Sequence, residues 1–129
     1  TFFSFVYETW AISPNIVFYS EKIYKCILNF HPFVAWANPH TIKYMNDNGY
    51  KSFNPHINEK YDNHISTENR SMLAMKEMVT LCDMTKIQLL DWYANQEEIL
   101  THNYNHFMTE YRFKKSVSQF LEVYDRVVE

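Results

Sequence analysis

The chain has 129 residues, of which 47% are hydrophobic, 18% aromatic and 21% charged. This length holds one folded domain, and this composition supports a packed core and argues against a disordered chain. The formal net charge of -3 gives no basic surface for a nucleic-acid backbone, so we expect no nucleic-acid partner. No apolar run approaches the ~18 residues that are needed to cross a bilayer, so we expect no membrane span.

The counts of cysteine and glycine exclude further classes of protein. Two cysteines, Cys26 and Cys82, are too few for a disulfide framework and indicate a reducing, cytoplasmic location. The single glycine, Gly49, excludes both the P-loop and the dinucleotide fingerprint, because each of these motifs requires several glycines. A phosphorylated ligand would therefore have to bind at a helix N-terminus with the help of side-chain cations.

The first part of the chain is predicted to alternate strands and helices. Residues 2–7 are apolar and aromatic, which predicts a buried strand, and residues 16–19 form a second short apolar run. Ser20 is the predicted N-cap of a helix that continues to residue 28. The continuous apolar run over residues 33–37 is typical of a parallel strand that is covered on both faces.

The next helix has clear signals at both of its ends. Asn38 is the predicted N-cap, Pro39 takes the first helical position, and Gly49 ends the helix as a left-handed cap. Residues 50–53 are then a candidate for a third strand, and residues 54–63 are polar and loop-like.

From residue 66 onward the sequence predicts helices. Ser66 begins one helix, and Thr85 with Gln88 forms a capping-box pattern for another. Apolar residues of the first of these helices recur at helical spacing, namely Met72, Met75, Val79 and Cys82. A further apolar stripe lies in the last stretch, residues 111–128, at Phe113, Val117, Phe120, Leu121, Tyr124 and Val128. We therefore expect one α/β domain over residues 1–129, with a short, mostly parallel Rossmann-like sheet in a βαβ-type half (1–65) and a helical half (66–129).

The start of the helix that Ser20 caps carries the strongest local signal for a ligand. Lys22 and Lys25 share one face of its first turns, where the helix dipole disfavours each exposed cation by roughly 0.3 to 1 kcal/mol. An anion bound there would reverse the sign of this cost. The alternative is an ordinary solvated helix in which Glu21 pairs with Lys25 at the i,i+4 spacing. The spacing alone leaves both interpretations open.

Glu8 directly follows the first predicted strand. Ligands of open α/β sheets bind beyond the carboxyl ends of the strands, so this carboxylate is well placed to accept hydrogen bonds from sugar hydroxyls. A solvated loop residue fits the same position, and the sequence does not separate the two.

Histidines and cysteines give weaker signals. His102 and His106 have the i,i+4 spacing that can present two imidazoles to one ion, with Glu110 as a candidate third ligand. No Glu follows His102, so the zinc-protease pattern is absent, and we expect no metal site and no cofactor.

Cys26 and Cys82 lie on apolar faces of their helices and are expected to be core residues rather than nucleophiles. The sequence identifies no catalytic residues.

Several segments resemble a known family. The residues that carry the resemblance are 5–9, 20–25 and 31–34. They are similar to the strand ending in Glu-Thr, the Ser/Thr-Glu-Lys helix start and the Pro-Phe-Ile strand of the C-terminal, nucleotide-sugar-binding half of GT-B glycosyltransferases of the fucosyltransferase-like and exostosin-like kind. Residues 38–53 and 58–62, together with Arg70, look like the continuation found in a group of uncharacterised viral and environmental proteins. The resemblance covers residues 2–107.

The resemblance implies roles for individual residues. Glu21 would bind the ribose of the donor, and Lys22 would contact its diphosphate. Lys25 would be a second cation, and Glu8 would lie near the sugar or the acceptor. The chain departs from the family pattern at Cys26, where the family has proline, and at residues 36–38, where a small residue or glycine normally follows the strand.

These observations lead to two interpretations of function. The first is a glycosyltransferase-like domain that binds a nucleotide diphosphate sugar but is catalytically incomplete alone, since a GT-B active site lies between two Rossmann-like domains and this chain has residues for one. The second is a non-enzymatic interaction module, in which aromatic residues of the last helices form a homo-oligomer or partner interface. Those residues are Trp92, Tyr93, Tyr104, Phe107, Tyr111 and Phe113. An exposed apolar patch on the final helices favours the module, whereas a solvent-lined cleft at Ser20 favours the transferase.

Overall fold

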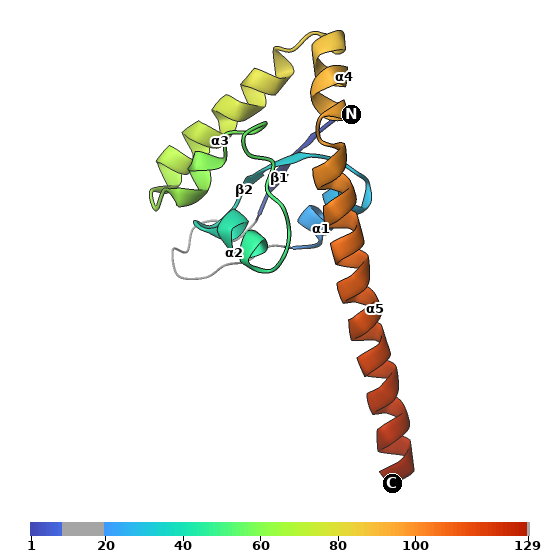
Figure 1. Ribbon diagram of the computed structural model, residues 1–129. Helices are drawn as coiled ribbons and strands as arrows, with labels where there is room; N and C mark the ends of the chain where they lie inside the picture. Colours follow the sequence, from blue (N-terminus) through green and yellow to red (C-terminus); the bar gives the residue numbers. More distant parts are fainter. Residues whose placement is uncertain (9–19, 129) are drawn as a thin grey trace.

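The computed structural model describes residues 1–8 and 20–128 of the chain. Its elements, in chain order, are β1 (Ser4–Tyr7), α1 (Glu21–Leu28), β2 (Phe33–Trp36), α2 (Thr41–Asp47), the 3-10 helix η1 (Glu59–Asn63), α3 (Thr67–Cys82), α4 (Lys86–Ala94) and α5 (Glu97–Val128). The strands form one sheet in the N-terminal part, and the C-terminal part is helical (Figure 1). The predicted α/β class is confirmed. The apolar run predicted over residues 16–19 lies outside the described residues.

The sheet consists of β1 and β2, which run parallel. Ser4 pairs with Phe33 at one end of the register, and Tyr7 pairs with Trp36 at the other. The helix α1 lies between the two strands in the sequence, so β1, α1 and β2 form the predicted βαβ unit. The core that covers this unit includes Ile23, Ile27 and Val34, which are buried.

Residues 50–53 do not form the third strand that the sequence predicts. The side-chain amide of Asn103 on α5 takes the place of a neighbouring strand there. Its Oδ1 accepts a hydrogen bond from the backbone N–H of Lys51 at 2.7 Å, and its Nδ2 donates one to the carbonyl of Lys51 at 2.9 Å. The buried amide of Asn103 thus satisfies both the backbone N–H and the carbonyl of Lys51. The segment therefore needs no strand partner and is attached to α5 instead.

The helix α2 starts two residues after Pro39, later than predicted. Its N-cap position holds His40 in place of the expected Asn38, and the His40 side chain makes no capping hydrogen bond. Asp62, from η1, supplies the cap, because its two carboxylate oxygens accept hydrogen bonds from backbone N–H groups in the first turn of α2 at 2.9 and 3.0 Å. Beyond the other end, Gly49 has a φ of 96°, which agrees with the predicted left-handed cap.

The apolar stripe predicted for the core side of α3 faces solvent. Met72, Met75 and Val79 are exposed, and so is Cys82, which is therefore not the core residue that the sequence suggested. The side chains that α3 buries are those of Arg70, Ala74 and Leu81. Arg70 donates hydrogen bonds to three backbone carbonyls of the domain at 2.6 to 3.2 Å, which turns its own face of the helix inward and the methionine face outward.

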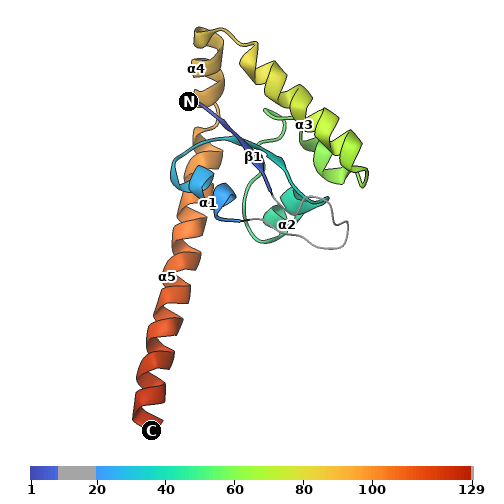
Figure 2. The same ribbon diagram turned by 180° about the vertical axis from the view of Figure 1, so that it is seen from behind.

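The last two helices confirm the predicted helical second half. Thr85 and Gln88 form the predicted capping box at the start of α4. The helix α5 has 32 residues; its first half packs against the domain, and its second half extends far beyond it (Figures 1 and 2). Among the described helices, none combines the length and the apolar character that crossing a membrane requires.

Candidate functional site

The carboxylate of Glu8 lies at the start of α1. Glu8 directly follows β1, and it is completely buried. Its Oε1 accepts hydrogen bonds from the backbone N–H of Ser20 at 2.8 Å and from the Ser20 hydroxyl at 3.1 Å. The same hydroxyl accepts a hydrogen bond from the N–H of Lys22 at 3.2 Å, so that Ser20 is the predicted N-cap. The carboxyl end of β1 and the N-terminus of α1 are thus joined through one acidic side chain.

Lys22 completes this cluster. Its Nζ donates a hydrogen bond to the carbonyl of Tyr7 at 3.0 Å and lies 3.8 Å from Oε2 of Glu8. The Lys22 side chain is 41% exposed, so part of it remains accessible to solvent. The sequence raised the question of which negative charge lies near Lys22 at the start of the helix. In the structure Glu8 of the same chain supplies this charge. We call Glu8, Ser20 and Lys22 the α1 cluster.

The structure does not bring the other two predicted site residues into this cluster. Glu21 is exposed in the first turn of α1, and Lys25 is exposed one turn further on. Among the described residues no ion pair joins Glu21 to Lys25, although their spacing allows one. Lys25 lines a separate surface hollow of about 240 Å³ with Cys26 and His31. Burial raises the pKa of the Cys26 thiol above its ordinary value, which fits a core residue rather than a nucleophile.

An aromatic pair lies beside the α1 cluster. Tyr7 ends β1 and Trp36 ends β2, and their rings stack with centroids 4.5 Å apart and an angle of 16° between the planes. Tyr7 is exposed and carries the carbonyl to which Lys22 donates. Parallel strands place their carboxyl ends at the same edge of a sheet, which brings this flat surface and the lysine together.

Residues 58–62 and Arg70, which carry part of the family resemblance, hold the fold together. The hydroxyl of Tyr61 accepts a hydrogen bond from the backbone N–H of Ala35 in β2 at 3.3 Å, and burial raises the Tyr61 pKa. Asp62 caps α2, and burial raises its pKa, with the α2 backbone N–H groups opposing the shift. These positions explain the motif by packing and capping, with no ligand required.

Glu59 borders a polar hollow beside η1. This hollow has a volume of about 280 Å³ and is lined by Asn46, Asn54 and Lys60 among others. The Glu59 carboxylate accepts a hydrogen bond from the backbone N–H of Phe53 at 3.1 Å. Burial outweighs this bond and raises the Glu59 pKa from 4.5 to about 7. The residue was not predicted as a site residue, because nothing in the sequence reports its burial.

The two histidines with metal-ligand spacing bind backbone carbonyls. Nε2 of His102 lies 2.8 Å from the carbonyl of Gly49, and Nε2 of His106 lies 2.7 Å from the carbonyl of Asn48. Since a carbonyl only accepts, each imidazole donates through Nε2. The pair thus satisfies carbonyls that follow the end of α2. In the part of the chain that the structure describes, no three His, Cys, Asp or Glu side chains form a metal-binding group.

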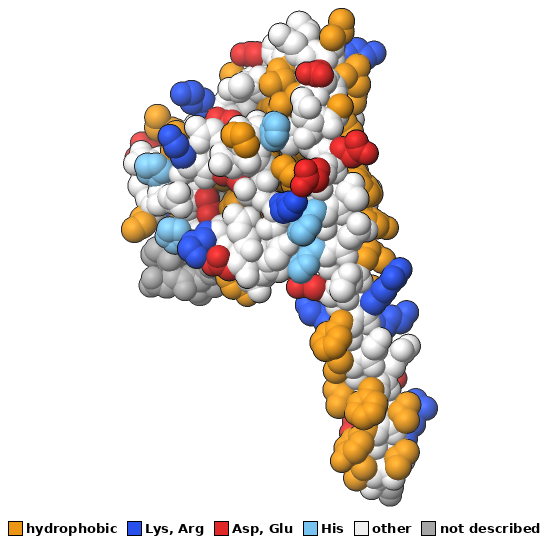
Figure 3. Space-filling model, in the orientation of Figure 1, with side chains coloured by type: hydrophobic (Ala, Val, Ile, Leu, Met, Phe, Trp, Pro, Cys, Tyr) orange, Lys and Arg blue, Asp and Glu red, His pale blue; other side chains and the backbone are white. Residues whose placement is uncertain are grey.

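The second half of α5 exposes a large apolar surface, which we call the distal α5 surface. It is formed by Phe113, Val117, Phe120, Leu121, Val123, Tyr124, Val127 and Val128. These side chains are between 41% and 78% exposed. Figure 3 shows apolar side chains gathered along the projecting end of the helix. Soluble monomers rarely expose so much contiguous apolar surface, and such patches mark interaction sites.

Comparisons with protein-family models, with curated proteins and with solved structures each found no match to this chain. They therefore do not bear on the resemblance to glycosyltransferases, which stays a prediction.

Proposed function

We propose that this chain is an interaction module that associates with itself through the distal α5 surface. The observation that carries the proposal is the exposure of eight large apolar side chains on one projecting helix. Burial of apolar surface stabilises association by roughly 25 cal/mol per Å², so a helix that exposes this many such groups gains free energy by pairing. The core of a protein interface is likewise rich in aromatic and aliphatic side chains.

The aromatic residues that the sequence assigned to an interface divide into two groups. Trp92 is buried, Tyr104 stacks on Phe30, and the ring of Phe107 lies tilted against that of Tyr24, so these three stabilise the chain itself. Phe113 is exposed and continues the series along α5. Residues before about 111 attach the helix to the domain, and the interface that we propose lies beyond them.

Sedimentation velocity over a series of protein concentrations tests this function. We expect the unmodified chain to sediment as an oligomer that dissociates on dilution. Phe120→Glu places a charge in the apolar surface and should yield a monomer. Gln119→Glu is the matched control, because it adds the same charge to a residue outside the distal α5 surface and should leave association intact. A chain that sediments as a monomer at every concentration would reject the proposal.

A second function, binding of a nucleotide diphosphate sugar, is favoured by one specific observation. Lys22 and the stacked pair of Tyr7 and Trp36 lie together at the carboxyl edge of the parallel sheet. An ammonium group suits a diphosphate, and a flat aromatic surface suits a base. The carboxylate of Glu8 weighs against this function, since it already supplies a negative charge to Lys22.

Calorimetric titration with uridine or guanosine diphosphate tests this second function. If the α1 cluster binds the diphosphate, Lys22→Ala should weaken binding by about 1.5 to 3 kcal/mol, which is the range for a hydrogen bond to a charged group. Lys25→Ala is the control and should weaken binding less, because Lys25 lies outside the cluster. Binding should also weaken as salt rises. The absence of any heat of binding with the unmodified chain would reject nucleotide binding by this chain.

A further inference from the structure

The apolar residues of the distal α5 surface follow the spacing of a coiled coil. Phe113, Val117, Phe120, Tyr124 and Val127 are separated by four, three, four and three residues. This alternation is the pattern of the a and d positions of a heptad, with Phe113, Phe120 and Val127 at d and the other two at a. The positions that face away from such a seam are polar or charged here. They are Lys115, Ser118, Gln119, Glu122, Asp125 and Arg126. The occupant that this pattern suits is another helix of the same kind.

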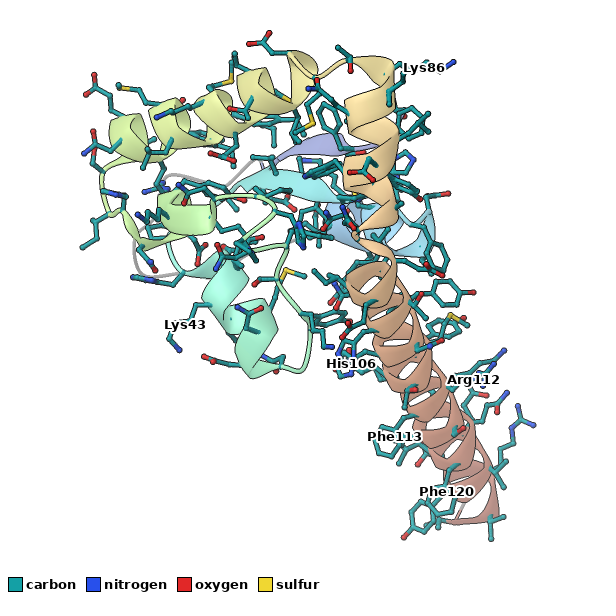
Figure 4. The ribbon with its side chains drawn as sticks, turned by 45° about the horizontal axis from the view of Figure 1, so that its top comes forward. Lys43, Lys86, His106, Arg112, Phe113 and Phe120 are labelled. Carbon is teal, nitrogen blue, oxygen red and sulfur yellow. The ribbon has the colours of Figure 1, made fainter. Side chains whose placement is uncertain are left out.

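The same spacing continues toward the start of α5. There the residues at the a and d positions contact the domain of the same chain. Asn103, His106 and Glu110 extend the alternation of three and four residues from Phe113 toward the start of α5. Each of them contacts the segment that follows α2: Asn103 binds Lys51, His106 binds the Asn48 carbonyl, and Glu110 accepts a hydrogen bond from the Tyr50 hydroxyl at 3.1 Å. Figure 4 shows His106, Phe113 and Phe120 on the same side of α5, with Arg112 on the opposite side. The distal seam is therefore the continuation of an interface that is already filled.

The contacts of the upstream half of α5 determine whether a partner helix can run parallel or antiparallel to it. In a parallel pair, the upstream half of the partner's α5 would run along the upstream half of the seam. That space is occupied by residues 48–51, which Asn103 and His106 hold at hydrogen-bond distance. In an antiparallel pair, the upstream half of each α5 lies beyond the end of the other helix, so the two domains are at opposite ends and do not collide.

We propose that the partner is a second copy of this chain, paired antiparallel through the distal α5 surface about a two-fold axis. Rotation about such an axis makes the two contributions identical, as is usual for homodimers. Placing a against d sets Phe113 opposite Tyr124 of the second copy, and Val117 opposite Phe120. The two layers next to the axis then combine Val117 with Phe120, a small side chain with a large one, which fills space better than two rings directly opposed. The two outer layers pair the aromatic rings of Phe113 and Tyr124. This inference rests on the proposed function and adds the orientation and the register.

The charges along the helix favour the same direction. Arg112, Lys114 and Lys115 give the segment 112–115 a net charge of +3, whereas Glu122, Asp125 and Arg126 give the segment 122–126 a net charge of -1. A parallel pair places the two positive segments side by side. An antiparallel pair places each of them beside the acidic segment of the other copy and near the negative end of its helix dipole.

Disulfide formation between single-cysteine variants tests the relative orientation of the two α5 helices directly. Phe113→Cys and Tyr124→Cys are made separately in a Cys82→Ser background, since Cys82 is exposed. In the antiparallel register, a mixture of the two variants should form a disulfide-linked dimer upon mild oxidation, and neither variant alone should. In this register, residue 113 of one copy lies about 16 Å along the helix axis from residue 113 of the other copy, because residues 113 and 124 are eleven positions apart and each position rises by 1.5 Å. The same separation holds between the two copies of residue 124. A disulfide requires Cα atoms closer than about 7 Å.

Energy transfer between dyes keeps the proposal testable if the cysteine variants associate poorly. A dye pair is attached at Glu97→Cys, in the same background with the distal α5 surface intact. The proposed register separates the two copies of residue 97 by about 65 Å along the helix axes, so transfer should be weak. Cross-linking of Tyr124→Cys with itself, or strong transfer at residue 97, would show a parallel pair and overturn the orientation while self-association stands. Sedimentation of the unmodified chain as a monomer would overturn the self-association itself.

Discussion

The imidazole of His106 lies against the Cα of Gly49. A Cβ built on Gly49 would meet Cε1 of His106 at 2.6 Å and Nε2 at 2.9 Å. The same histidine binds the carbonyl of Asn48, the residue before the glycine. The single glycine of the chain therefore does two things: it adopts a φ of 96° after α2, and it lets α5 approach the backbone closely.

Gly49→Ala should therefore destabilise the fold. A non-glycine residue at this φ and the contact with His106 together should lower the free energy of unfolding by about 1 to 3 kcal/mol. Urea denaturation measures this change. In a His106→Ala background the same substitution should cost less, because only the backbone strain remains. An equal loss of free energy of unfolding in both backgrounds would contradict a contact between the added Cβ and His106.

The pKa of Glu59 predicts a loss of stability as pH rises. Its pKa is raised to about 7 in the folded chain from 4.5, so between these values the folded state binds more protons than the unfolded state. The free energy of unfolding should then fall from pH 4.5 to about 7 and level off above it. Asp62, whose pKa is also raised, contributes in the same direction.

Glu59→Gln isolates the part that Glu59 contributes. This variant cannot ionise, so it should show a shallower fall and should be more stable than the unmodified chain above pH 7. Thermal unfolding followed by circular dichroism at several pH values measures this. Glu122→Gln, at an exposed carboxylate of α5, should leave the profile unchanged. A profile of Glu59→Gln identical to that of the unmodified chain would refute the assignment.

Removal of the buried carboxylate at the start of α1 should also destabilise the chain. Glu8→Ala leaves the Ser20 N–H and hydroxyl without their acceptor, which we expect to lower the free energy of unfolding by about 1 to 3 kcal/mol. Glu8→Gln keeps an acceptor oxygen and should lose less. Glu21→Ala, at an exposed carboxylate of the same helix, should change stability by no more than about 0.5 kcal/mol. Denaturant titration of the three variants checks this order.

Local signals in the sequence predicted the ends of several helices correctly. Ser20, Ser66 and Thr85 are N-caps, as expected, because a capping hydroxyl binds backbone groups only two or three residues away. The parallel pairing of the two strands also follows from the sequence, since two apolar runs separated by a helix favour it. Interactions between residues close in the chain were therefore predictable.

Features that depend on distant residues were not predictable. Asn38 was expected to cap α2, but Asp62 does so from 20 residues away along the chain. Residues 50–53 read as a strand, but the side chain of Asn103 satisfies the backbone of Lys51. No local pattern reports either partner.

The candidate site follows the same division. Glu8, Ser20 and Lys22 were singled out from the sequence, and the structure brings them together. The spacing left open whether an external anion binds at the start of α1. It did not show that Glu8 itself lies beside Lys22, because this depends on how β1 and α1 meet. The exposure of the apolar stripe of α5 was equally hidden, since the same pattern occurs on buried helices.

Amide hydrogen exchange of residues 113–128 at increasing protein concentration is the most direct test of self-association through the distal α5 surface. In a monomer, these amides are protected only by an exposed helix that opens locally, whereas in a dimer they exchange only after the copies separate. We therefore predict that exchange in this segment slows as the concentration rises, while exchange in α1 does not change. Exchange in residues 113–128 that is fast and identical at every concentration would contradict the account.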